Sequence, residues 1–199
     1  VDSAPAYRVH GSTQQTSAPP FTNEQLEALA LALMRGQQRG EFEEKMEMNL
    51  ALYYKELGRF RVNIFRQRGN VGLVFRHIKA EIQTTDQLGL PQIVKDIAMT
   101  KRGLVLVVGA TGSGKSTTLA AMIDHRNSIH PSHIVTVEDP IEFVHSHKRS
   151  LITQREVGFD TLSFQNALKN TLRQAPDVIL IGEVRDTETM EAAITFAET

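Results

Sequence analysis

An eight-residue stretch, Gly109–Ser116, has the residue types that hold phosphate groups. It reads GATGSGKS and fits the pattern G-x-x-x-x-G-K-[ST] at every fixed position. Glycines let backbone N–H groups turn inward around phosphate oxygens, and the start of a helix adds its positive dipole end. The alternative is a Gly-rich turn that matches by chance. The apolar stretch before it and the helix predicted after it favour a loop that binds ATP or GTP.

Single residues of this loop have distinct expected roles. Lys115 supplies a positive charge for the β- and γ-phosphates, and the Ser116 hydroxyl ligates Mg²⁺. ATP and Mg²⁺ are therefore the predicted cofactors. The predicted nucleotide-binding residues are Gly109, Ala110, Thr111, Gly112, Ser113, Gly114, Lys115, Ser116 and Thr117.

One acidic residue follows the apolar stretch Val178–Ile181. Ligands of parallel sheets bind beyond the carboxyl ends of the strands. We therefore expect Glu183 to act on Mg²⁺ through a water molecule, or to polarise the attacking water. The alternative is a solvated acid in a turn.

A second acidic cluster follows the apolar stretch Ile134–Val137. A carboxylate there can accept a proton from the attacking water or orient it. Glu138 is the favoured base, and Glu142 is the second candidate. Asp139 precedes Pro140, and a role in the turn is at least as well supported there as catalysis.

Five arginines lie close together between residues 59 and 76. An arginine from another domain or subunit often stabilises a transferred phosphoryl group. By themselves, however, the residues favour a solvated strand face. The five are Arg59, Arg61, Arg66, Arg68 and Arg76.

The hydrophobic pattern predicts a small α+β domain over residues 1–85, with a loose entry before a helix from Thr22 to about Arg35. Apolar residues that alternate with polar ones then predict three antiparallel strands, over Met48–Leu52, Phe60–Ile64 and Val71–Phe75.

A linker and a connecting helix are predicted over residues 86–102 and an α/β domain over residues 103–199. Uniformly apolar stretches, including Leu104–Val108, predict parallel strands, and Ser163 and Thr187 open two of the helices between and after them. The expected fold class is α/β.

Composition excludes several other classes of protein. The net charge is −1, so nucleic acid is not an expected partner, and there is no cysteine for disulfides or cysteine-ligated metal. No apolar run approaches the roughly 20 residues of a membrane span. The chain lacks an initiating Met and stops in a predicted helix, so we expect a fragment truncated at both ends.

Three motifs in order resemble one family. Leu172–Asp186, with the sequence LRQAPDVILIGEVRD, resembles the signature of the type II/IV secretion-system ATPases. Glu138–His145, EDPIEFVH, resembles that family's aspartate box. Gly58–Asn63, GRFRVN, resembles a first-domain strand of its PilT/PilU pilus retraction ATPases. The resemblance runs from about Thr22 to the end of the chain.

The resemblance implies more than the residues do. It implies a PAS-like first domain and a RecA-like P-loop domain, with ATP between them, in a hexameric ring that powers pilus retraction and twitching motility. Arg61 and Arg76 would then contact the nucleotide. An inner-membrane pilus platform protein and a paralogous PilT-like ATPase are the implied partners. The implied location is cytoplasmic, with peripheral association to the inner membrane.

Two alternatives stay open within this resemblance. One is an extension or secretion motor, although the absence of cysteine argues against the zinc-binding insert usual in such motors. The other is a non-hydrolysing ring component that depends on a partner ATPase. The family's histidine box would follow Thr199, so we expect a chain without it to bind nucleotide and turn it over poorly.

Overall fold

The computed structural model describes residues 3–9, 11–78 and 81–198 and divides the chain into two compact units. The first is Val1–His77 and the second is Ile78–Thr199. This division lies at His77, whereas the sequence suggested a boundary near residue 85. Among the described residues, no helix combines the length and apolar character needed to cross a bilayer.

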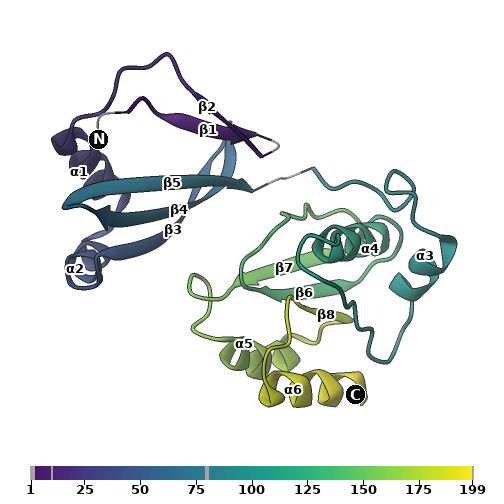
Figure 1. The fold of residues 1–199 in the computed structure, drawn as a ribbon. Helices are drawn as coiled ribbons and strands as arrows, with labels where there is room; N and C mark the ends of the chain where they lie inside the picture. Colours follow the sequence, from purple (N-terminus) through teal and green to yellow (C-terminus); the bar gives the residue numbers. More distant parts are fainter. Residues whose placement is uncertain (1–2, 10, 79–80, 199) are drawn as a thin grey trace. The chain divides into compact units, whose positions relative to one another are not determined.

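The first unit packs two helices on a three-stranded sheet (Figure 1). The chain order is β1 (Ala6–Val9), β2 (Ser12–Gln15), α1 (Asn23–Leu33), α2 (Gly36–Lys45), β3 (Glu47–Tyr54), β4 (Gly58–Gln67) and β5 (Asn70–Ile78). The sheet order is β3-β4-β5, with β3 and β4 antiparallel. The three strands and α1 were predicted and are confirmed. The PAS-like assignment stays a prediction.

Alternation along the strands builds the core of this unit. Val62 and Ile64 on β4 are almost fully buried and pack with Ala30 of α1 and Phe42 of α2. Thr22 caps α1 through the expected capping box, since the Gln25 N–H donates to Thr22 Oγ1 and the Thr22 N–H donates to Gln25 Oε1. Both helices pack on the sheet face that carries Val62 and Ile64.

Two elements of this unit were missed. Residues 1–21 were expected to be loose, but β1 and β2 form an antiparallel hairpin whose residues are exposed, so no apolar period marks it. No helix was predicted between about Arg35 and the first strand, but Gly36 begins α2. That helix buries Phe42 and otherwise has little apolar character, which removes the periodic signal.

The second unit is a parallel sheet with helices on both faces (Figure 1). Its elements are α3 (Gln92–Ala98), α4 (Lys115–Ile129), β6 (His133–Glu138), β7 (Leu151–Glu156), α5 (Phe164–Thr171), η1 (Leu172–Gln174), β8 (Val178–Ile181) and α6 (Thr187–Glu198). The strand order is β7-β6-β8, with both pairs parallel. The predicted α/β class with a parallel sheet is confirmed; β7 was missed.

The two sheet faces are covered differently. Ile123 of α4 packs with Ile134 of β6 and Ile152 of β7 on one face. Val137 of β6 packs with Leu168 of α5, and Phe196 of α6 joins the same cluster on the other face. Because side chains alternate along a strand, the even-numbered residues of β6 face α4.

The prediction of a strand over Leu104–Val108 was wrong. A strand needs a hydrogen-bonded ladder with a neighbour, and this run forms none within the described part of the chain. Four of its five apolar side chains are also exposed, with Val108 at 89%. A uniformly apolar stretch predicts a buried strand only where helices cover both faces of the sheet that it joins.

Candidate functional site

The loop before α4 has the backbone geometry that its glycines predict. Gly112 and Gly114 have φ values of 80° and 92°, which only glycine adopts readily. Gly109 lacks a side chain for another reason, since a Cβ there would lie 2.6 Å from Ser113 Oγ. The loop leads directly into α4, with Gly114 as N-cap. Backbone N–H groups at the start of this helix can therefore bind an anion.

The Lys115 side chain folds back over this loop. Its ammonium donates to the carbonyl oxygens of Gly109 (2.8 Å) and Ala110 (2.9 Å). Both acceptors are neutral, so these bonds do not cancel the charge. Ser116 is exposed and Thr117 half-buried in the first turn of α4. A positive charge and a hydroxyl thus lie at one helix start, as phosphate and Mg²⁺ binding require.

The start of α4 lies towards the carboxyl edge of the sheet. Its other end is tied to the amino edge, because Arg149 Nη1 donates to Ile129 O and Ser150 Oγ donates to His130 O just before β7 begins. A helix of 15 residues spans about 22 Å, and a six-residue strand about 20 Å. The loop therefore reaches the edge at which the parallel strands end.

Glu138 ends β6 at this edge, on the face that α4 covers. Gly182, one residue beyond β8, donates its N–H to Val137 O (2.8 Å). A Cβ on Gly182 would lie 3.1 Å from Glu138 Cα, so the glycine permits this close approach. The structure thus brings the ends of β6 and β8 together.

The Glu138 carboxylate is largely buried and hydrogen-bonded. Thr136 Oγ1 donates to its Oε1 at 2.6 Å, and Gln154 Nε2 donates to the same oxygen at 3.2 Å. Burial raises the pKa of Glu138, and the nearby Glu156 carboxylate adds to the rise. The two hydrogen bonds and one from the Glu142 backbone oppose it without reversing it. A carboxylate with a raised pKa is a stronger base, as proton abstraction requires.

The other acidic candidates have different surroundings. Glu183 follows β8 and pairs with Arg185, at 2.7 Å between Oε1 and Nε. Glu142 has an exposed side chain, and its backbone rather than its carboxylate contacts Glu138. Asp139 lies in the turn before Pro140, across a cis peptide bond. The geometry therefore favours Glu138 over Glu142 as the base.

The arginine candidates belong to the first unit. Alternation along β4 places Arg59 and Arg61 on the sheet face opposite Val62 and Ile64, away from the two helices. Arg76, on β5, is exposed. Arg66 has a packing role instead, since its guanidinium lies 5.6 Å from the Phe42 ring centroid and pairs with Glu27. Nucleotide contact by Arg61 and Arg76 stays a prediction.

The segment between β6 and β7 is anchored to the end of α4 by Asn127, which sequence reasoning missed. This side chain is fully buried; its Nδ2 donates to Ser146 O, and its Oδ1 accepts from the backbone of Lys148 and Ser150. Lys148 also pairs with Asp124 at 2.7 Å. A lone asparagine in a helical period gives no signal of such a role. The anchoring fixes where the segment returns to the sheet.

Replacing Asn127 by Ala should lower the free energy of unfolding by about 2–3 kcal/mol. The change removes all three hydrogen bonds of a fully buried side chain, among them the one to the backbone N–H of buried Ser150. Each lost bond costs about 0.5–1.5 kcal/mol, and a buried group left unsatisfied costs about 1–3 kcal/mol. Denaturant unfolding measures the loss. Asn166→Ala, at an exposed position of α5, should stay within about 0.5 kcal/mol of the parent. Equal stabilities for the two variants would contradict the anchoring role.

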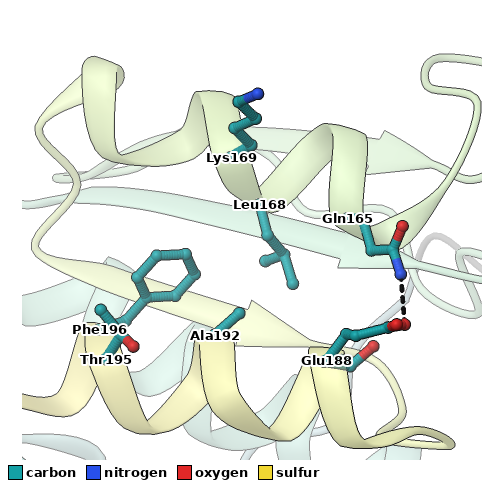
Figure 2. Close-up of a pocket in the computed structure, with 8 residues that line it drawn as sticks. Gln165, Leu168, Lys169, Glu188, Ala192, Thr195 and Phe196 are labelled. Carbon is teal, nitrogen blue, oxygen red and sulfur yellow. Dashed lines mark hydrogen bonds between the residues drawn. The ribbon is translucent and has the colours of Figure 1, made fainter.

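A pocket between α5 and α6 is separate from this site (Figure 2). Leu168, Ala192 and Phe196 give it an apolar lining, and Gln165 donates to Glu188 at its rim. These helices cover the sheet face opposite α4. The pocket therefore belongs to the other side of the sheet from Lys115 and Glu138.

A glycine-rich loop at a helix start, with a carboxylate at the end of a parallel strand, is arranged as in P-loop nucleotide-binding proteins. The chain belongs to the type II/IV secretion system protein family, whose family model matches residues 9–199. The family resemblance seen in the sequence is confirmed.

Two curated relatives from Pseudomonas aeruginosa match over 195 residues, or 98% of this chain. The identity is 53% to the type IV pilus ATPase PilU and 48% to the type IV pilus retraction ATPase PilT. These matches cover 51% and 57% of the relatives, so the chain spans about half their length. The crystal structure of the pilus retraction motor PilT with bound ADP is similar at a TM-score of 0.93 and 45% identity, over 99% of this chain and 58% of that one.

Proposed function

We propose that this protein is an ATP-binding and ATP-hydrolysing motor subunit that powers retraction of type IV pili. The observation that carries the proposal is the joint placement of the phosphate-type loop and Glu138 on one face and at one edge of the parallel sheet. The similarity to pilus ATPases, one of them solved with bound ADP, supports the same function. A hexameric ring that contacts a pilus platform protein is part of the proposal.

The proposed chemistry is in-line transfer of the γ-phosphoryl group of ATP to water. Lys115 and the N–H groups at the start of α4 bind the phosphates and offset charge that develops on them. Ser116 would ligate Mg²⁺, and Glu183 would hold one of its water ligands; hydroxyl and carboxylate oxygens suit this hard cation. Bound there, Mg²⁺ would offset part of the negative charge that develops on the phosphates.

Glu138 has the proposed role of base. It orients the attacking water and accepts its proton as the bond between the γ-phosphorus and its bridging oxygen breaks. Its partly desolvated carboxylate suits this step, because burial keeps its pKa raised. Arg61 and Arg76 are proposed to stabilise the charge on the nucleotide. The energy of hydrolysis would drive movement within a ring of subunits.

Deletion of the gene tests the direction of the motor. A retraction motor removes pili, so its loss should leave cells with excess surface pili and no twitching. Complementation with the wild-type gene should restore both, and the Lys115→Ala gene should restore neither. Electron microscopy of the pili and a plate assay of twitching give the two readings. Bald cells would instead indicate an extension motor.

A further inference from the structure

One side chain on β7 joins Glu138 to the segment that follows it. Gln154 Nε2 donates to Glu138 Oε1 at 3.2 Å and to Phe143 O at 3.0 Å. Its other amide atom, Oε1, accepts from the His145 N–H at 2.7 Å. The two donor hydrogens and the acceptor oxygen of one amide are thus all engaged.

The strand register explains this placement. Gln154 lies opposite Thr136 on the neighbouring strand β6, and Glu138 is two residues further along β6 on the same face. Thr136 and Gln154 therefore reach the same carboxylate oxygen from two strands. Gly182 lies on the other side of Glu138, so close that a Cβ on it would be only 3.1 Å from Glu138 Cα.

We propose that Gln154 is a positioning residue for Glu138, whose amide fixes the direction of the carboxylate and links it to the backbone of residues 143–145. This inference rests on the proposed function, because Glu138 is the group on which Gln154 acts. Of the amide, hydroxyl and carboxyl side chains, a glutamine suits the position, because it donates twice and accepts once. A glutamate in its place would accept only.

The linked segment is itself held in place. His145 is largely buried, and burial lowers its pKa to about 4, so its ring is neutral near pH 7. A few residues later the chain is tied to α4 through Asn127. Gln154 thus couples the carboxylate to a segment with little freedom to move, which is what orientation of a base requires.

The charges around Glu138 come from several elements. Glu156, its register partner on β7, raises its pKa. Glu183 follows β8 at the same edge, and Asp139 and Glu142 follow β6 directly. Lys115 lies at the start of α4 on the same face. The hydrogen bond from Gln154 acts against the acidic neighbours, because it stabilises the ionised carboxylate.

The test compares two replacements of Gln154 in the full-length protein. Gln154→Leu removes every amide contact, and Gln154→Glu keeps an acceptor for the His145 N–H while losing both donors. Each should lower kcat for ATP about tenfold, the loss expected on removing one hydrogen bond to a charged group. The KM should change less than about twofold, because no phosphate contact is lost. The acid limb of the kcat profile should move to higher pH.

A double mutant separates positioning from general stability. In a Glu138→Gln background, Gln154→Leu should cause no further loss of kcat, because the group on which it acts is already gone. Gln165→Leu, which removes an exposed glutamine that donates to Glu188 on α6, should leave kcat and its pH profile unchanged. An additive loss, or a full kcat in Gln154→Glu, would overturn the proposal.

A second measurement, of the pKa of Glu138, does not depend on ATP turnover. Isotope-edited infrared difference spectra can follow the titration of the Glu138 carboxyl in the parent and in Gln154→Leu. The pKa should be higher in the variant, and an unchanged pKa would overturn the proposal even if the parent hydrolyses no ATP. If the parent and Glu138→Gln instead release phosphate equally while the pKa still shifts, the proposed function fails and the contact to Glu138 stands.

Discussion

Lys115→Ala is expected to abolish ATP turnover, with a loss of about 100-fold or more in kcat/KM. Its ammonium is the one charge that α4 brings to the loop Gly109–Ser116, where it folds across two neutral carbonyls. The β- and γ-phosphates gain negative charge as the bond breaks, and that charge would lose its fixed cation. Mg²⁺-dependent phosphate release by the full-length protein measures the effect.

A matched lysine separates this effect from a general loss of charge. Lys169→Ala changes an exposed lysine of α5, on the opposite face of the sheet, and should leave turnover within about twofold. Thermal unfolding of both variants should match that of the parent, because neither lysine is buried. Equal phosphate release by Lys115→Ala and the parent would refute the proposed ATPase.

Glu138→Gln is expected to preserve ATP binding and to remove turnover. The amide cannot accept a proton from water, and loss of a general base lowers rates by about 10²–10⁴-fold. Thr136 Oγ1 and Gln154 Nε2 can still donate to the amide oxygen, so the side chain should keep its place. Binding is measured by calorimetry with ATP and Mg²⁺, and turnover by phosphate release.

The pH dependence of the parent follows from the same carboxylate. Glu138 must be ionised to accept a proton, so kcat should fall as the pH drops through its pKa. Burial holds that pKa above the ordinary glutamate value of 4.5, so the fall should begin at a higher pH than for an exposed glutamate. In Glu138→Gln this limb should disappear from the residual activity.

Two further glutamate variants complete this test. Glu191→Gln, on the exposed surface of α6, should behave as the parent. Glu142→Gln tests the second candidate, and its exposed side chain leads us to expect a loss of less than about tenfold. A large loss in Glu142→Gln together with full activity in Glu138→Gln would exchange the two roles.

Much of the fold could be predicted where the signal is local. Thr22 and Gln25 predict the start of α1, because a capping box is formed within four consecutive residues. The strand β8 was predicted with its observed bounds, since a short apolar run between a Pro-Asp pair and a glycine leaves few alternatives. Elements without a periodic signal were missed, namely the exposed hairpin β1–β2, the polar helix α2 and the strand β7.

By itself, the sequence determined the loop Gly109–Ser116 and the helix after it. The loop's requirements are all local: glycines that accept a positive φ, a lysine beside the last of them and a helix start. The same locality explains why Glu138 and Glu183 could be named as candidates, since each follows its own apolar stretch.

Only the tertiary structure decided which candidate is equipped to act as a base. Glu138 lies between Gln154, 16 residues later on β7, and Gly182 beside β8. These neighbours depend on strand order and register, which cannot be predicted from any single stretch of the sequence. Tertiary packing also left Leu104–Val108 without a ladder, although its composition is that of a buried strand. The burial, the raised pKa and the hydrogen-bond partners of Glu138 depend on contacts between different strands, so they are determined only once the sheet has assembled.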